Sequence, residues 1–283
     1  MKNNILPEAA EIQRIVKTAL AEDIGAGDVT SQLLLSSHTI ATLDFVSRKP
    51  MVACGLFIPQ AVYEALGDKV EVVQRVGEGT AVSAGTSLVV ANGAARTLLA
   101  GERVTLNLIQ RMCGVATLTH AYVQAVSGTK AIILDTRKTM PGLRAFDKYA
   151  VRAGGGQNHR LRLDDMVLIK DNHIALCGGV GKAVDAVRHH EKSGLPIVVE
   201  CDTLAQVKEA LVTRPDRILL DNMTAGQLRE AVIMVAGKIP LEASGGVTLD
   251  TVRKIAESGV DYISVGALTH SAPAADIGAD IQF

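Results

Sequence analysis

The stretch Pro196–Gly246, PIVVECDTLAQVKEALVTRPDRILLDNMTAGQLREAVIMVAGKIPLEASGG, decides the fold. Three apolar runs in it, PIVVECD, DRILLDN and PLEASGG, alternate with the helical segments TLAQVKEALVTR and TAGQLREAVIMVAGK. Connections of this length suit crossover helices, which predicts that the strands are parallel. Glu200, Asp221 and Glu242 recur at intervals of 21 residues, and each is predicted to end its strand.

The same rhythm continues on both sides of this stretch. KAIILDT and DMVLIKD precede it and DYISVGAL follows it, which gives six predicted strands. A repeated βα unit predicts an α/β fold, either a TIM-like barrel or, as the alternative, a doubly wound sheet. The barrel is favoured because strand-end acids recur on successive units. Six strands are fewer than eight, so the barrel is incomplete or a strand is hidden in Phe146–Arg152.

The first part of the chain has a different pattern. Apolar residues at helical spacing predict an amphipathic helix from Pro7 to Ala21. Residues 39–91 are β-branched and punctuated by Gly and Pro, which predicts a β-rich unit with the helix PQAVYEAL laid across it. Residues 94–126 read as helical, either as one helix or as two helices broken near Gly114.

Composition excludes several classes of protein. The 283 residues include 48% hydrophobic and 21% charged residues, with a formal net charge of −1 and only 3% aromatic residues. Nearly neutral charge with few stacking rings argues against a nucleic-acid surface. No apolar run reaches the length of a membrane helix and the N-terminus does not resemble a signal peptide, so no membrane association is expected. Four scattered cysteines indicate no zinc site or disulfide framework and fit a cytoplasmic protein.

Basic residues are concentrated between Asp135 and His173, in a stretch bounded by two predicted strands. Such charges at strand ends and on loops suit a small ligand with several negative charges. The basic residues of the stretch are Arg137, Lys138, Arg144, Lys148, Arg152, His159, Arg160, Arg162 and Lys170.

Glycines follow the last two predicted strands, in Ser244-Gly245-Gly246 and in Val265-Gly266-Ala267. Backbone N–H groups at these positions of a barrel can approach a phosphate, although the glycines could also merely end the strands. Glu200 and Asp221 form a candidate Mg²⁺ pair beside that phosphate, with helix capping as the alternative role. Lys170 either forms a Schiff base or holds a substrate carboxylate, and the neighbouring arginines favour the second role.

These motifs together resemble the quinolinate phosphoribosyltransferase family. The resemblance lies in residues 135–173, in AEDIGAGDVTS and ERVTLNLIQR upstream, and in VVECDT, ILLDNM, LEASGGV and ISVGALTHS downstream. It implies an open α/β barrel of fewer than eight strands beside an N-terminal α+β sandwich domain. We therefore expect the sandwich domain at 1–115, joined by the tail 273–283, and the barrel at 116–272.

The resemblance also implies an activity. Quinolinate and 5-phosphoribosyl 1-pyrophosphate would give nicotinate mononucleotide, pyrophosphate and CO₂ in NAD biosynthesis, with Mg²⁺ as cofactor. Family members are homodimers, or assemblies of dimers, whose active sites are shared between subunits.

Site residues are implied position by position, and the sequence departs from the family pattern at none of them. Glu200 and Asp221 would bind the metal, and they would act in catalysis together with Lys138 and Lys170. The residues implied to hold quinolinate are Arg103 from the partner subunit, Arg137, His159, Arg160 and Lys170. Those implied to bind phosphoribosyl pyrophosphate are Lys138, Thr139, Glu200, Asp221, Ser244, Gly245, Gly246, Val265, Gly266, Ala267 and His270.

Two other classes of function stay open on the residues alone. One is a Schiff-base aldolase or decarboxylase acting through Lys170. The other is a barrel that binds anions without catalysis.

Overall fold

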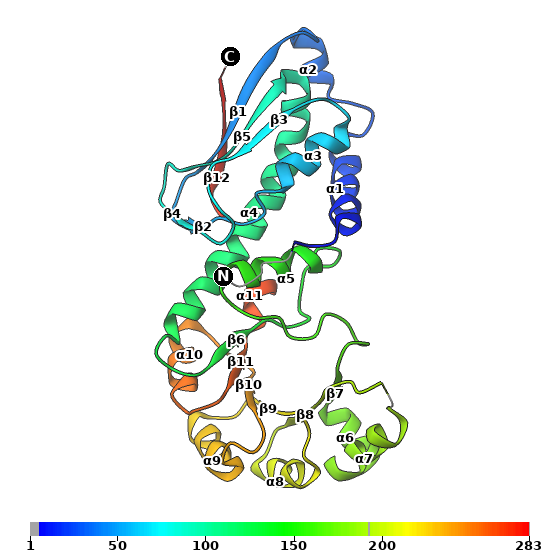
Figure 1. The fold of residues 1–283 in the computed structure, drawn as a ribbon, viewed down its shortest axis with the longest axis vertical. Helices are drawn as coiled ribbons and strands as arrows, with labels where there is room; N and C mark the ends of the chain where they lie inside the picture. Colours follow the sequence, from blue (N-terminus) through cyan, green and yellow to red (C-terminus); the bar gives the residue numbers. More distant parts are fainter. Residues whose placement is uncertain (1–5, 192, 283) are drawn as a thin grey trace. The chain divides into compact units, whose positions relative to one another are not determined.

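The computed structural model describes residues 6–191 and 193–282, and these residues divide into two compact units (Figure 1). The first unit takes the chain up to His120, Thr139–Gly155 and the segment from Ser271 onward, and the second takes Ala121–Lys138 and Gly156–His270. The predicted boundary at 115/116 therefore differs from the structure, chiefly because residues 139–155 were assigned to the barrel. No helix among the described residues is long and apolar enough to cross a membrane.

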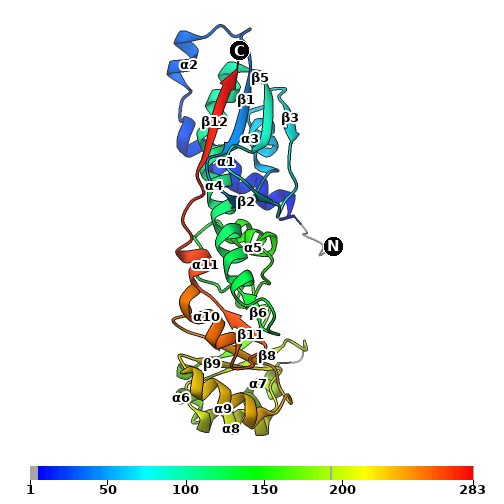
Figure 2. The same ribbon diagram turned by 90° about the vertical axis from the view of Figure 1, so that its left-hand side faces the viewer.

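An antiparallel sheet forms the centre of the first unit, with strand order β12-β1-β5-β3. Strand β12, red in Figure 2, runs beside β1, blue, although the two are far apart in sequence. A separate pair, β2 (Met51–Val52) and β4 (Ala81–Val82), completes the described strands of this unit. The sheet strands are β1 (Ile40–Ser47), β3 (Glu71–Gln74), β5 (Ser87–Ala94) and β12 (Ile277–Gln282).

Helix α4 is a single helix over Ala95–Ala125. The alternative of two helices broken near Gly114 is therefore wrong. A Cβ atom at Gly114 would collide with the carbonyl oxygen of Pro273, so glycine is there for close packing and does not break the helix. The other helices of the unit are α1 (Ala9–Ile24), α2 (Val29–Leu34), α3 (Ile58–Leu66) and α5 (Arg144–Ala153).

The strand suggested within Phe146–Arg152 is wrong, because this segment lies inside helix α5. Phe146, Tyr149 and Ala150 are all buried. Their spacing of three and four residues is helical rather than alternating. Arg144, Lys148 and Arg152 belong to this helix and hence to the first unit, so the basic stretch of the sequence is divided between the two units.

The second unit is an open α/β barrel, as the sequence predicted. Its six described strands are parallel and follow the order β6-β11-β10-β9-β8-β7, so that β6 and β7 are the two edges. A single bridge from Leu134 to Gln157 extends the β6 side. The strands are β6 (Ile132–Leu134), β7 (Val167–Ile169), β8 (Ile197–Cys201), β9 (Arg217–Asp221), β10 (Leu241–Ser244) and β11 (Tyr262–Ser264).

Helices follow the strands and lie outside them, as α8 and α9 do in Figure 1. Val207, Ala210 and Leu228 are fully or almost fully buried on the inner faces of these helices, as are Val199 and Leu220 on the strands. The helices of this unit are α6 (Asp171–Cys177), α7 (Val180–His190), α8 (Leu204–Thr213), α9 (Ala225–Val235), α10 (Leu249–Ala256) and α11 (Ala267–His270).

Candidate active site

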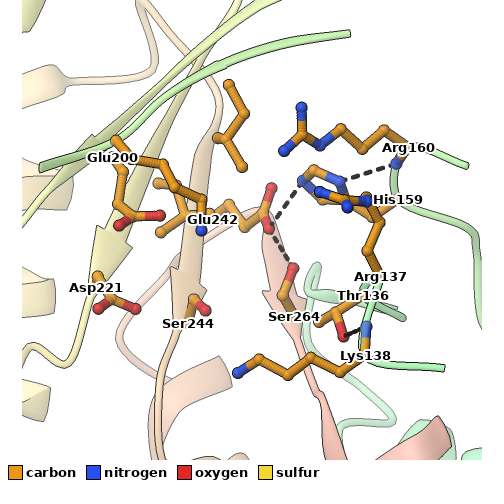
Figure 3. Close-up of a pocket in the computed structure, with 13 residues that line it drawn as sticks. Thr136, Arg137, Lys138, His159, Arg160, Glu200, Asp221, Glu242, Ser244 and Ser264 are labelled. Carbon is orange, nitrogen blue, oxygen red and sulfur yellow. Dashed lines mark hydrogen bonds and ion pairs between the residues drawn. The ribbon is translucent and has the colours of Figure 1, made fainter. Parts of the chain in front are cut away.

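A cavity of about 400 Å³ lies at the carboxyl ends of the parallel strands in the second unit (Figure 3). Strand register explains which side chains reach it: Glu200, Leu219 and Glu242 occupy one row across three strands, and Asp221 and Ser244 occupy the row two residues further on. Side chains two residues apart on a strand point to the same side, here the inside of the barrel. The lining residues are Thr136, Arg137, Lys138, His159, Arg160, Leu168, Lys170, Glu200, Leu219, Asp221, Glu242, Ser244 and Ser264.

The acidic side of the cavity is formed by Glu200 and Asp221, near the ends of β8 and β9. With Asp202, which the sequence reasoning missed, they offer carboxylate oxygens that all lie within 4.8 Å of one another. Burial raises the pKa of Glu200, and the nearby charge of Asp221 adds to that increase while Lys170 opposes it. Burial also raises the pKa of Asp221, with Asp202 raising it further.

The alternative role for these acids, helix capping, is taken by other residues. Thr203 and Thr224 are the N-caps of α8 and α9, and each accepts a hydrogen bond from the backbone N–H of a glutamine three residues later. Glu200 and Asp221 are thus left facing the cavity. Three converging carboxylates suit a hard divalent cation such as Mg²⁺, which prefers oxygen ligands and would neutralise their repulsion.

The basic side of the cavity includes Arg137 and Arg160. Burial lowers the pKa of Arg160, and the charge of Arg137 lowers it further. Nη1 of Arg160 donates to the carbonyl oxygen of Met166 at 3.1 Å, which helps to fix the guanidinium. Lys170, next to β7, lines the same cavity. Two neighbouring guanidinium groups favour a ligand with more than one negative charge.

Two buried carboxylates, Asp135 and Glu242, support this basic side. Asp135 accepts from the backbone N–H of His159 at 2.8 Å and from Nδ2 of Asn158 at 2.6 Å. Glu242 is 0% exposed and contacts Arg217, His159 and Ser264. Although burial acts to raise the pKa of Glu242, its contacts with His159, Ser264 and Arg217 hold that pKa below its ordinary value.

The structure corrects the expectation that Glu242 ends its strand. It is the second residue of β10, which continues to Ser244, and it is enclosed by protein groups instead of standing at the rim. The spacing of 21 residues was the signal that pointed to this position. Nothing in the sequence pattern, however, separated a buried acid from two exposed to the cavity. Thr136 and Ser264 also line the cavity, and no pattern in the sequence pointed to them.

Glycine-rich turns follow β10 and β11. Gly245 has φ +94°, and a Cβ atom there would overlap the side chain of Asn222. A Cβ atom at Gly266 would lie 3.1 Å from Cδ of Lys138 and 3.1 Å from Nε2 of His270, so this turn reaches the cavity-lining lysine. Among the described residues, the lining set does not include the predicted Gly245, Gly246, Val265, Gly266, Ala267 or His270.

Two predicted residues belong to the first unit. Arg103 is on α4, where its side chain is 58% exposed and Nη2 lies 3.8 Å from Glu102. Oγ1 of Thr139 accepts from Nε of Arg144 at 3.0 Å. The eight predicted residues that the cavity brings together are Arg137, Lys138, His159, Arg160, Lys170, Glu200, Asp221 and Ser244.

Comparison with known proteins decides the family. The sequence model described as quinolinate phosphoribosyl transferase, C-terminal domain, matches residues 115–280, and the model of the N-terminal domain matches residues 28–113. The chain belongs to the quinolinate phosphoribosyltransferase family. The resemblance seen in the sequence and the expected fold are both confirmed.

Members of this family are similar to the chain along nearly its whole length. The nicotinate-nucleotide pyrophosphorylase [carboxylating] of Mycobacterium leprae is 46% identical over 94% of this chain and 95% of its own length. A probable enzyme of the same name from Bacillus subtilis is 38% identical over 96% and 93%. The solved nicotinate-nucleotide pyrophosphorylase of Francisella tularensis is 36% identical, with a TM-score of 0.93 over 99% of this chain and 98% of that chain.

Proposed function

We propose that the chain converts quinolinate and 5-phosphoribosyl 1-pyrophosphate into nicotinate mononucleotide, pyrophosphate and CO₂ in NAD biosynthesis. The single observation that carries the proposal is the division of one cavity into a basic side with Arg137 and Arg160 and an acidic side with Glu200 and Asp221. A planar dicarboxylate fits the first side, and a ribosyl centre that becomes cationic fits the second. The names of the relatives agree with this reaction.

Recognition of quinolinate follows from the basic side. Arg137, Arg160 and Lys170 can pair with its two carboxylates through charge-assisted hydrogen bonds. Nicotinate has one carboxylate and would leave part of this buried positive charge unpaired, which is costly. The family pattern adds Arg103 from a partner subunit to this set.

Transfer of the ribosyl group needs no protein nucleophile, because the pyridine nitrogen attacks the anomeric carbon. Glu200 and Asp221 stabilise the positive charge that develops there, and Lys138 stabilises the charge of the departing pyrophosphate. The turns around Gly245 and Gly266 supply backbone N–H groups for the 5′-phosphate. A bound Mg²⁺, held by Glu200, Asp221 and Asp202, would supply further neutralisation of pyrophosphate charge.

Loss of CO₂ follows ribosylation. The carboxylate next to the ring nitrogen leaves as CO₂, and its bonding electron pair stays on the ring carbon. The adjacent positively charged nitrogen stabilises that carbanion until it takes a proton. The protein's contribution to this step is to hold the ring and its second carboxylate in place.

We also propose that the protein is a homodimer and that it is located in the cytoplasm. A homodimer with shared sites is supported by the exposed position of Arg103 on α4 and by the family pattern. A cytoplasmic location is supported by the absence of disulfides, since all four cysteines are free.

One assay tests the proposed function. Purified protein with quinolinate, phosphoribosyl pyrophosphate and Mg²⁺ should release CO₂ and pyrophosphate in equal amounts. A binding protein without catalysis would release neither. A lysine Schiff base would instead be trapped by borohydride at Lys170 in the presence of a carbonyl substrate, and we expect no such adduct.

A further inference from the structure

The buried carboxylate of Glu242 has no role in the proposed reaction, yet it lines the cavity and lies next to His159 of the basic side. Three side chains from different segments surround it. Nη1 of Arg217 is 2.7 Å from Oε2, Nε2 of His159 is 3.4 Å from Oε1, and Oγ of Ser264 donates to Oε1. These contacts are visible in Figure 3 for His159 and Ser264. A buried charge with this many partners is held in one position.

His159 is engaged on its other nitrogen as well. The backbone N–H of Arg160 donates to Nδ1 of His159 at 2.8 Å. A nitrogen that accepts a hydrogen bond has no proton of its own, so the ring proton must be on Nε2, which faces Glu242. Both ring nitrogens are therefore directed at protein groups.

We propose that Glu242 is a positioning residue that holds His159 as the neutral Nε2–H tautomer and thereby fixes Arg160 for the dicarboxylate. The connection runs from Glu242 to the imidazole, and from Nδ1 to the backbone N–H of Arg160. His159 then contributes to quinolinate binding through Arg160.

Arg217 contacts Oε2 of Glu242, whereas His159 lies near Oε1. Its guanidinium also lies over the ring of Tyr262, with Cζ 4.1 Å from the ring centroid. Since Arg217 balances the charge of Glu242, the carboxylate can orient His159 without requiring the imidazole to be protonated.

Kinetics of a Glu242→Gln variant test this role, which rests on the proposed function. Glutamine keeps the size of the side chain and removes its charge. We expect the KM for quinolinate to rise about tenfold, as for the loss of one charged hydrogen bond, while the KM for phosphoribosyl pyrophosphate stays within about twofold. The matched control is Asp261→Asn, because Asp261 accepts from the backbone N–H of Leu241 at 2.9 Å, at the opposite end of the same strand. An equal rise in both variants would show a structural effect on β10 and overturn the proposal.

A double-mutant cycle separates action through His159 from an independent effect. In a His159→Ala background, Glu242→Gln should change the KM for quinolinate by less than about twofold, because residues that act as a unit are not additive. Additive effects would contradict the proposal.

The tautomer itself is measured without turnover, so the result does not depend on the reaction. The ¹⁵N spectrum of histidine-labelled wild-type protein at pH 7, with His159 assigned by comparison with His159→Ala, should show a neutral ring with its proton on Nε2. An imidazolium or an Nδ1–H tautomer at that pH would refute the idea, even if the protein releases CO₂ as proposed and even if Glu242→Gln does not fold.

Discussion

Glu200 and Asp221 lie near the carboxyl ends of neighbouring parallel strands and bring their carboxylate oxygens within 4.8 Å of each other and of Asp202. Burial and the charge of Asp221 raise the pKa of Glu200, and burial and the charge of Asp202 raise the pKa of Asp221. The pairing register of the two strands brings these acids together.

Asp202 is expected to contribute to metal affinity. Asp202→Asn should raise the Mg²⁺ concentration needed for half-maximal activity by about tenfold, in the range seen for groups around a metal site. Asp185→Asn, an exposed acid on α7, is the control and should leave that concentration unchanged. Titration of Mg²⁺ after treatment with a chelator measures both. If both variants need the same Mg²⁺ concentration for half-maximal activity, Asp202 is not part of the metal site.

Arg137 is expected to select for a dicarboxylate. Arg137→Ala should raise the KM for quinolinate by about ten- to a hundredfold, since a charged hydrogen bond is worth about 1.5–3 kcal/mol. Arg253→Ala is the control, because Arg253 is exposed on α10 and pairs with Glu257. Steady-state kinetics with quinolinate and nicotinate provide the measurement. The proposal fails if Arg137→Ala leaves the KM for quinolinate unchanged.

Glu200 is expected to destabilise the fold at neutral pH when no metal is bound. Its pKa is raised by burial above the ordinary 4.5, with Lys170 opposing and Asp221 adding to the shift. A raised folded-state pKa gives stability that is full below 4.5 and is lost as the pH rises through the folded value. Glu200→Gln should therefore raise the Tm at pH 7 in chelator by a few degrees, on the order of 1 kcal/mol or less, while activity falls.

The Tm of Glu200→Gln is also compared with that of the wild type at pH 4. Because the carboxyl group is then largely protonated in the folded state, the variant should show a smaller gain. An identical gain at both pH values would mean that charge is not the cause.

Gly245 and Gly246 form a matched pair for backbone strain. Gly246 has φ +59° with open space around a Cβ atom, so Gly246→Ala should cost about 1 kcal/mol of stability. Gly245→Ala adds an overlap with Asn222 and should cost about 2–4 kcal/mol. Chemical denaturation of both variants measures the difference. Equal losses would mean that Asn222 moves aside without penalty.

Shared active sites predict complementation between subunits. Arg103→Ala and Lys138→Ala should each be inactive alone, because each lacks one residue of every site. A mixed dimer would contain one intact site, so mixing after subunit exchange should restore about a quarter of wild-type activity, with half the dimers mixed and one of two sites intact. Exchange is verified with differently tagged subunits. Mixed dimers without activity would argue against a shared site.

The strands of the barrel were predictable because each is a short apolar run between polar ends, and their alternation with helices fixed the parallel arrangement. Arg137, Lys170, Glu200 and Asp221 were predictable because strand ends of a barrel converge. Helix α5 could not be predicted from the sequence, and neither could the assignment of residues 139–155 to the first unit. An amphipathic segment rich in Arg and Lys carries no local sign of which unit it packs against. Asp202 was missed because an exposed acid after a strand looks like loop polarity.

Strand β12 (Ile277–Gln282) pairs along the length of β1 (Ile40–Ser47). During synthesis the ribosome makes β1 long before β12, a delay of roughly ten to fifty seconds at ordinary translation rates. Throughout that interval one edge of β1 lacks its partner, and an open edge is a template for pairing with other chains. The nascent chain is therefore exposed to aggregation at this edge until β12 is made, and a chaperone would protect it during that interval.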